Sequence, residues 1–353
     1  MAQAYSCGAR CDHELGEYSK NMARAPIPRA EVYETYWRFA SERQAVFERR
    51  LAGATGPWSM DPILQEYKFC NVFRAADRVS QYMIRSVCYP EVPASPQDAI
   101  FQIVAFRTFS WPDTWEGLRS LLGRYPTLED LANGSFEDAL ETLRSDKRKL
   151  YTGAFILCAN DIYGRRVKHL NHVELFRHMF LMGDASERIL RAQSLEEVFG
   201  ILRGYPLFGD FMAYQTAIDL NYSPHVNFSE DDFTKAGPGA IRGIRKVFED
   251  TGGMSPSEVI MWMVEHQDEE FERLGLKFDG LRGRRLHAID AQGLFCETDK
   301  YCRLAFPELS VGRKRMKSRF TPDAAPIDYF FPPKWGINGG DAVSNSATSG
   351  QRL

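Results

Sequence analysis

Three consecutive acidic residues, Glu230, Asp231 and Asp232, are the strongest candidates for chemistry in this sequence. A carboxylate stabilises the positive charge that develops at a sugar carbon when its bond to a base breaks, or it activates a water molecule. The simpler interpretation is a solvated helix start, because acids are favoured at the positive end of a helix dipole. The turn sequence Gly237-Pro238-Gly239 that follows agrees with both interpretations.

A short turn in the segment 204–220 is a second candidate site. Its residues, Pro206-Leu207-Phe208-Gly209, separate two predicted helices. Such a turn exposes backbone N–H groups at the start of the second helix, where they suit a phosphate oxygen. A break of this kind is also the ordinary connection of a helical hairpin, so the turn alone does not establish phosphate binding.

The elements that position these residues are predicted to be helices. Apolar residues recur at helical spacing over residues 31–51, and again from the helix start Asp61-Pro62 as far as Phe73. Further helices are expected over residues 127–134, 135–146, 194–204, 208–220, 240–250 and 255–274. Alternation typical of strands is scarce, and the apolar run 101–109 is the one ambiguous segment. The predicted fold class is therefore all-α.

Composition indicates an ordinary globular protein and excludes several classes. The chain has 353 residues, 44% hydrophobic and 26% charged, with 44 basic and 47 acidic side chains and a net charge of −3. That balance excludes binding of nucleic acid through a basic tail. No apolar run is long enough to span a membrane, and the N-terminus does not resemble a secretory signal. With seven dispersed cysteines we expect reduced thiols and a cytoplasmic, monomeric protein.

Charge is unevenly distributed along the chain. Residues 273–320 hold twelve Lys and Arg against five Asp and Glu, a local excess of +7, which leaves −10 for the remainder. Such an excess fits contacts to the phosphate backbone of DNA, although basic patches are usually solvated surface. We assign Arg284, Arg285 and Lys314 to this role.

We expect three segments: a loosely ordered start (1–27), a helical body (28–333) and a disordered tail (334–353) rich in Gly, Ser and Asn. No metal or other cofactor is predicted. The spacing of Cys7, Cys11 and His13 is a weak zinc pattern in a loosely ordered segment. Nor does the sequence contain a phosphate-binding loop of the type G-x-x-x-x-G-K-[ST], so no ATP site is expected.

Residues 206–213 resemble the hairpin of helix-hairpin-helix DNA glycosylases of the endonuclease III type. In the order of that superfamily, residues 61–85 are similar to its first core helix and turn, while 125–132 and 135–157 are similar to the helices that follow. The resemblance covers about residues 60–250 and implies two helical lobes around a DNA-binding cleft.

This resemblance also implies roles for single residues. The superfamily's catalytic aspartate corresponds to a position within 228–233, which includes Glu230, Asp231 and Asp232 without choosing among them. Strand-cleaving members carry a lysine that forms a Schiff base, and Phe211 occupies that position here. The resemblance therefore implies a monofunctional glycosylase.

The same resemblance implies contacts to DNA and to an extruded base. Arg74 occupies the position of the side chain that fills the gap left by the base; a surface ion pair with Asp77 is the alternative. Further DNA contacts are assigned to Leu207, Phe208, Gly209, Gly237 and Gly239. The base pocket is assigned to Phe69, Asn71, Gln215, Asp219 and Tyr222.

A closer resemblance extends over most of the chain. Residues 61–64, 68–74, 219–223, 236–240 and 296–301 resemble the α-glutamyl/putrescinyl thymine pyrophosphorylase family, which includes the helical domain attached to phage 5-hydroxymethyl-deoxyuridine DNA kinases. This family acts on hypermodified bases in phage DNA. Anti-phage DNA glycosylase activity on α-glucosylated 5-hydroxymethylcytosine is also associated with proteins that resemble it.

The leading hypothesis is a monofunctional DNA glycosylase that extrudes and excises a bulky modified base, such as α-glucosylated 5-hydroxymethylcytosine, from double-stranded phage DNA in anti-phage defence. One alternative is a transferase that replaces the pyrophosphate of an activated 5-hydroxymethyluracil without breaking the sugar bond. The other is a non-catalytic protein that recognises modified DNA.

Overall fold

The computed structural model describes residues 24–153, 161–310, 316, 318–321 and 328–338. As predicted, these residues are mainly helical. The α-helices are α1 (Ala30–Leu51), α2 (Pro62–Glu66), α3 (Arg78–Met83), α4 (Pro96–Phe109), α5 (Pro112–Leu122), α6 (Leu128–Asn133), α7 (Ser135–Ser145), α8 (Lys168–Phe176), α9 (Ala185–Arg191), α10 (Leu195–Arg203), α11 (Asp210–Tyr222), α12 (Pro238–Val247), α13 (Pro256–Glu265), α14 (Gln267–Arg273) and α15 (Ala288–Ala305).

Short elements complete the described fold. Two antiparallel strands, β1 (Ile27–Pro28) and β2 (Phe248–Asp250), join the start of the described chain to the end of α12. The remaining turns of helix are η1 (Arg74–Ala76), η2 (Ile84–Cys88), η3 (Arg177–Met182), η4 (Pro307–Leu309) and η5 (Pro333–Trp335).

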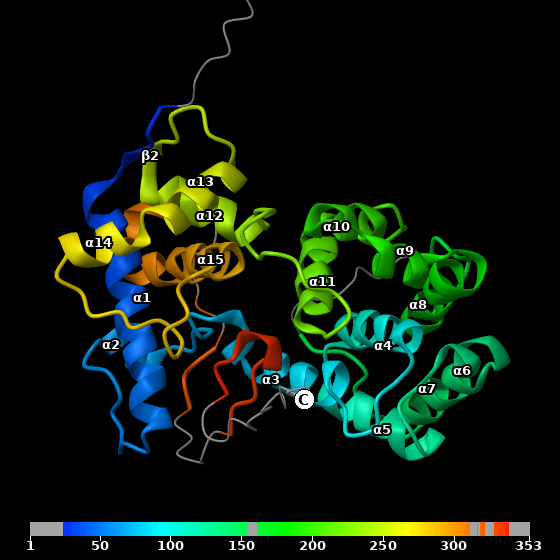
Figure 1. The fold of residues 1–353 in the computed structure, drawn as a ribbon. Helices are drawn as coiled ribbons and strands as arrows, with labels where there is room; N and C mark the ends of the chain where they lie inside the picture. Colours follow the sequence, from blue (N-terminus) through cyan, green and yellow to red (C-terminus); the bar gives the residue numbers. More distant parts are fainter. Residues whose placement is uncertain (1–23, 154–160, 311–315, 317, 322–327, 339–353) are drawn as a thin grey trace, which may run out of the picture.

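Figure 1 shows the helices gathered in two groups. The first consists of α1 and α12–α15, and the second consists of α4–α11. The second group is continuous in sequence, whereas the first combines the earliest long helix with four late ones. Helix α3, with η1 before it and η2 after it, lies between the groups.

Helix α15 is the centre of the first group. It packs along α12 and contacts α1 and α13. From α1, the buried Tyr36 hydroxyl donates a hydrogen bond to the carbonyl of Ala291 at 3.2 Å. Gly243 on α12 permits the close approach of α15, because a Cβ at that position would lie 2.1 Å from the Phe295 carbonyl oxygen.

The helix predicted from Asp61 to Phe73 is wrong in length. Asp61 begins it as expected, since its carboxylate accepts the N–H groups of Ile63 and Leu64. Helix α2 nevertheless ends at Glu66, where the backbone pairs with residues 318–320 instead of continuing its own helical bonds. The ambiguous run 101–109 belongs to α4 and is buried on every side, which explains why it lacks an amphipathic pattern.

Ordered structure extends five residues into the segment expected to be a disordered tail. Lys334 Nζ donates hydrogen bonds to the carbonyls of Asn221, Ser223 and Val226 at the end of α11. Trp335 packs edge-on against Tyr222. Two expectations, for residues 1–23 and for residues 339–353, lie outside the described residues.

The contact at Gly243 leads to a stability prediction. Replacing Gly243 by Ala forces α12 away from α15, and we expect it to lower the free energy of unfolding by about 3 kcal/mol. Gly293→Ala on α15 is the control, because its Cβ would meet no described atom within 4 Å and alanine favours helix. Urea unfolding of both variants tests this; equal stabilities would contradict the packing argument.

Candidate active site

A buried carboxylate, Asp219 of α11, joins the second helix group to η1, which lies between the groups. Its Oδ1 accepts a hydrogen bond from Arg74 Nη2 at 2.7 Å, and its Oδ2 pairs with Arg107 of α4. Arg74 Nε also donates to Gln215 Oε1 at 2.8 Å, and its guanidinium lies over the ring of Tyr222. Three of the predicted base-pocket residues, Gln215, Asp219 and Tyr222, are therefore brought together around Arg74.

Arg74 does not protrude as a side chain that could enter DNA. Only 12% of its side chain is exposed, and its Nε and Nη2 are engaged by Gln215 and Asp219 of α11. Burial alone would lower the pKa of Arg74, but the carboxylate of Asp219 outweighs burial and raises it. In this arrangement the guanidinium of Arg74 is paired with Asp219 and does not project as a wedge, and its insertion into DNA stays a prediction. The ion pair with Asp77 that was the alternative is not formed either.

The three acids that follow α11 have different surroundings. Glu230 is buried and pairs with Arg284 at 2.6 Å, while that guanidinium stacks on Trp335 at 3.9 Å from the ring centre. Asp232 is exposed and lines a cavity of about 490 Å³ beside α13. Only Asp231 combines partial burial with a helix terminus.

Asp231 is held by two hydrogen bonds at the start of α15. Its Oδ1 accepts the Ala288 N–H at 2.9 Å and its Oδ2 lies 2.8 Å from Nδ1 of His287. Burial would raise the pKa of Asp231, but the contacts with His287 and the Ala288 N–H outweigh it and hold the pKa below its usual 3.8. The side chain is 29% exposed, so Asp231 is an ionised carboxylate that solvent and a ligand can reach.

His287 and Asp290 complete this end of α15. Burial would lower the pKa of His287, but its bond to Asp231 raises the value above the usual 6.5. Asp290 Oδ1 accepts the backbone N–H of Arg74 at 2.9 Å. Burial, followed by the charge of Glu230, raises the pKa of Asp290 to about 6. A raised carboxyl pKa is common among groups that transfer protons, and here it arises first from burial, because Asp290 is only 4% exposed.

Sequence reasoning missed Arg107, His287 and Asp290. Arg107 is the one charged residue in the apolar run 101–109, which was a signal of a buried ion pair. His287 and Asp290 stand three apart at the start of a helix, a spacing typical of capping, but nothing in the sequence places them beside Asp231.

Residues 204–209 connect α10 and α11 as the predicted hairpin. Leu207 has a positive φ of 72°, and Phe208 is buried. Gly209 precedes α11 with an ordinary φ of −72°, and a Cβ there would meet no described atom within 4 Å. The described fold therefore does not itself require a glycine at position 209.

Packing accounts for the other two glycines that were assigned to DNA. A Cβ at Gly237 would lie 2.6 Å from the ring of Phe211, and one at Gly239 would lie 2.6 Å from the sulfur of Cys296. Both residues let the start of α12 approach its neighbours. Their presence in the sequence is thus no sign of a DNA contact.

Most described cations of the local basic excess pair with acids, whereas Arg282 donates to the carbonyl of Ile337. Arg284 is engaged by Glu230 and Trp335, and Arg285, which is half exposed, lies 3.5 Å from Asp268. Lys314 lies outside the described residues. Other cations of the 273–320 stretch also have acidic partners: Arg273, Lys277, Lys300, Arg303 and Arg319.

The remaining predicted base-pocket residues lie apart from the Arg74 cluster. Phe69 packs against Phe39 of α1, and Asn71 Oδ1 accepts a hydrogen bond from Arg43 at 2.7 Å. Both residues therefore face α1 rather than α11.

Comparison with known proteins agrees with the helical architecture. A family model described as the helical domain of 5-hmdU DNA kinase matches residues 30–311. The chain belongs to this family. A curated relative, the 5-hmdU DNA kinase of Bacillus phage SP10, is 28% identical over 301 residues, which cover 79% of this chain and 46% of the relative. The chain thus spans about half of the relative's length, and no solved structure matches it.

Among the described residues of this family member, no helix is long and apolar enough to cross a membrane. The match begins at the start of α1 and ends just after η4. The matched range contains Asp219 and Asp231 together with the side chains that contact them. Trp335, on which Arg284 stacks, lies beyond the matched range.

Replacing Asp219 by Asn leaves two buried guanidinium groups without their shared counter-charge. We expect the free energy of unfolding to fall by about 3–5 kcal/mol. Glu34→Gln is the control, since Glu34 pairs with Arg38 and Arg273 at the exposed surface and the loss of such pairs costs about 1 kcal/mol or less. Chemical denaturation measures both; similar losses would show that Asp219 does not stabilise the junction.

The pair of His287 and Asp231 predicts a pH dependence of stability. Because the pKa of folded His287 is raised above 6.5, its stabilisation is complete below that pH and is lost as the pH rises through the raised value. Asp231, with its pKa lowered below 3.8, loses its contribution only as the pH falls through that lowered value. We expect the Tm difference between wild type and His287→Gln to be largest near about pH 5 and to shrink in alkali.

Thermal unfolding across this pH range measures the effect. Asp231→Asn is the matched variant, because it removes the same pair from the other side and should abolish the same pH dependence. A Tm difference that stays constant with pH would contradict the ion pair.

Proposed function

We propose that this protein is a DNA glycosylase that hydrolyses the bond between deoxyribose and a modified base. The observation that carries the proposal is Asp231, an ionised and partly exposed carboxylate held at the N-terminus of α15. In the reaction, water adds to the sugar carbon and the base leaves with a proton. The products are a free base and an abasic site.

The contacts of Asp231 suit the charge that this reaction develops. A sugar that loses its base becomes positively charged, and a fixed carboxylate lowers the energy of that state. The hydrogen bonds from His287 and Ala288 orient Asp231 before the substrate arrives. Asp290, with a pKa near 6, is the neighbouring group suited to proton transfer.

The hairpin supports contact with DNA. The start of α11 presents backbone N–H groups and the positive end of a helix dipole, a combination that binds phosphate. The described fold does not require glycine at position 209. A glycine there leaves room for a phosphate group to approach the backbone closely. Phe211 occupies the position of the lysine nucleophile in strand-cleaving glycosylases, so we expect base excision without cleavage of the strand.

A modified base is the proposed target because of the family. The curated relative is named for 5-hmdU in DNA. The resemblance found in the sequence also includes a glycosylase that removes α-glucosylated 5-hydroxymethylcytosine. We propose a bulky modified pyrimidine in double-stranded phage DNA as the substrate, excised by a cytoplasmic monomer in anti-phage defence. Such a base must leave the stacked duplex before the sugar bond is accessible.

The assay uses unmodified, hydroxymethylated and α-glucosylated DNA. We expect alkali-labile sites and a released base only with modified DNA, and no strand cleavage before alkali. Asp231→Asn should lower the rate by about a hundredfold or more. Asp113→Asn, an exposed acid on α5, is the control and should react as wild type.

The other outcomes identify the competing functions. Release of pyrophosphate with the sugar bond intact would establish a transferase. Binding that depends on the modification but yields no product would establish a non-catalytic reader. If Asp232→Asn abolishes base release while Asp231→Asn retains it, the assignment of Asp231 is wrong.

A further inference from the structure

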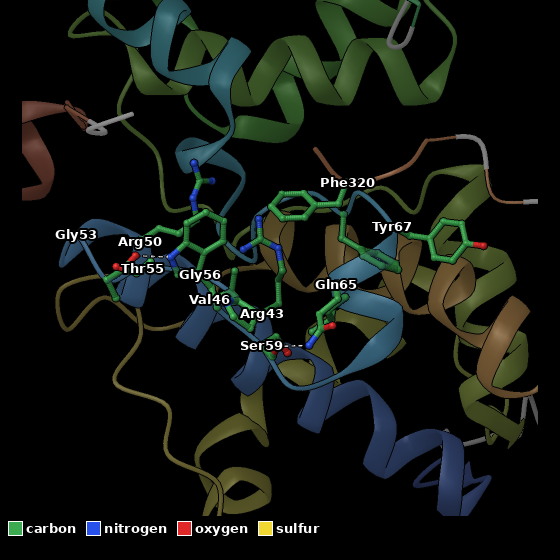
Figure 2. A pocket seen from close by; sticks show the side chains of 15 residues that line it. Arg43, Val46, Arg50, Gly53, Thr55, Gly56, Ser59, Gln65, Tyr67 and Phe320 are labelled. Carbon is green, nitrogen blue, oxygen red and sulfur yellow. Dashed lines mark hydrogen bonds between the residues drawn. The ribbon is translucent and has the colours of Figure 1, made fainter. Parts of the chain in front are cut away.

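A cavity of about 600 Å³ lies between α1, the loop 53–59 and α2. Figure 2 shows it from close by, and we call it the α1 cavity. None of the three candidate catalytic acids lines it. Its volume is within the range of small-molecule sites. The side chains that define its chemistry are Arg43, Arg50, Trp58, Gln65, Phe69 and Phe320.

Arg43 places a positive charge at the wall of the α1 cavity. Its guanidinium points into the space beside Phe320 in Figure 2. Within the described residues its side-chain hydrogen bond goes to Asn71 Oδ1, at 2.7 Å, and no carboxylate forms an ion pair with it. Burial lowers the pKa of Arg43, partly opposed by the more distant charge of Asp77. A partly buried cation without a directly paired carboxylate is stabilised by an anionic ligand.

Asn71 fixes the direction of this guanidinium. The Asn71 side-chain amide donates to the Ala76 carbonyl at 2.7 Å, and its backbone N–H donates to Asp77 Oδ1 at 2.9 Å. With the amide nitrogen held in this way, Oδ1 faces Arg43. The remaining N–H groups of Arg43 are therefore oriented before any ligand binds, as a fork that suits phosphate.

Aromatic rings form the other side of the α1 cavity. Trp58 is fixed by a hydrogen bond from its Nε1 to the Ala54 carbonyl at 2.6 Å, and Phe320 meets it edge-on at 6.2 Å between ring centres. Arg50 lies 5.1 Å from the centre of the Trp58 ring and adds a second positive charge. Aromatic rings beside arginine are the surface on which nucleic-acid bases stack.

We propose that the α1 cavity binds a nucleotide, with its base against Trp58 and Phe320 and its phosphate on Arg43. An apolar ligand would leave the charge of Arg43 uncompensated, and a bare anion would leave the aromatic wall without a partner. A nucleotide satisfies both. It comes either from the DNA strand or from solution, and the proposal does not depend on the catalytic role of Asp231.

Calorimetric titration of the full chain with deoxyuridine monophosphate tests the proposal. Inorganic phosphate and deoxyuridine are the two partial probes, and each should bind more weakly than the nucleotide. Arg43→Gln should weaken nucleotide binding by about tenfold to a hundredfold, the effect of losing a charge-assisted hydrogen bond. Arg38→Gln is the control, because Arg38 lies on the same helix with its charge at the exposed surface.

A second variant and a second ligand keep the test decisive. Phe320→Ala removes a ring at the cavity wall and serves if Arg43→Gln unfolds. A short oligothymidylate separates the sources: binding of the mononucleotide supports a free ligand, and binding of the oligonucleotide alone, weakened by both variants, supports a nucleotide of the strand. The proposal is overturned if neither ligand binds, or if binding is unchanged by Arg43→Gln and Phe320→Ala.

Discussion

The carboxylate of Asp219, buried between the guanidinium groups of Arg74 and Arg107, is the interaction on which the described architecture depends. Burying two positive charges is costly, and the one negative charge that they share at hydrogen-bond distance offsets this cost. The three residues come from η1, α4 and α11, so the ion triad fixes η1 to the second helix group, and the backbone N–H of Arg74 continues the connection to Asp290 of α15 in the first. It also holds Gln215 and Tyr222 in place around Arg74.

Helix α15 transmits this order to the candidate catalytic residue. Its first turn supplies the N–H of Ala288 to Asp231 and the carboxylate of Asp290 to the backbone of Arg74. Its middle is fixed by α12, through the close approach at Gly243, and by the hydroxyl of Tyr36. The position of Asp231 is therefore set by a long, well-packed helix even though the residue itself lies in a loop. Such support is what a preorganised carboxylate requires.

Local signals in the sequence predicted the helices, the start at Asp61 and the hairpin before Gly209, because caps and periodicity act over a few residues. The errors came from partners distant in the chain. Helix α2 stops early because residues 318–320 take its backbone bonds, and Arg74 turns inward because Asp219, 145 positions away, receives its charge. The count of charges in residues 273–320 likewise missed the acids that pair with Arg284 and Arg285, because Glu230 and Asp268 lie outside this segment. The placement of Asp231 beside His287 required the fold.

The two helix groups differ in how their parts are ordered along the chain, and this has a consequence for synthesis. Helices α4–α11 follow one another, so their contacts form between neighbours as the chain emerges. Helix α1 differs, because its Tyr36 donates a hydrogen bond to Ala291, which is 255 positions later in the chain. Before α12 and α15 have left the ribosome, Phe69 can cover Phe39 of α1, but Tyr36 still lacks its native partners. Among the described helices, α1 is thus the earliest long one and is completed as a core element only by the late helices of the chain.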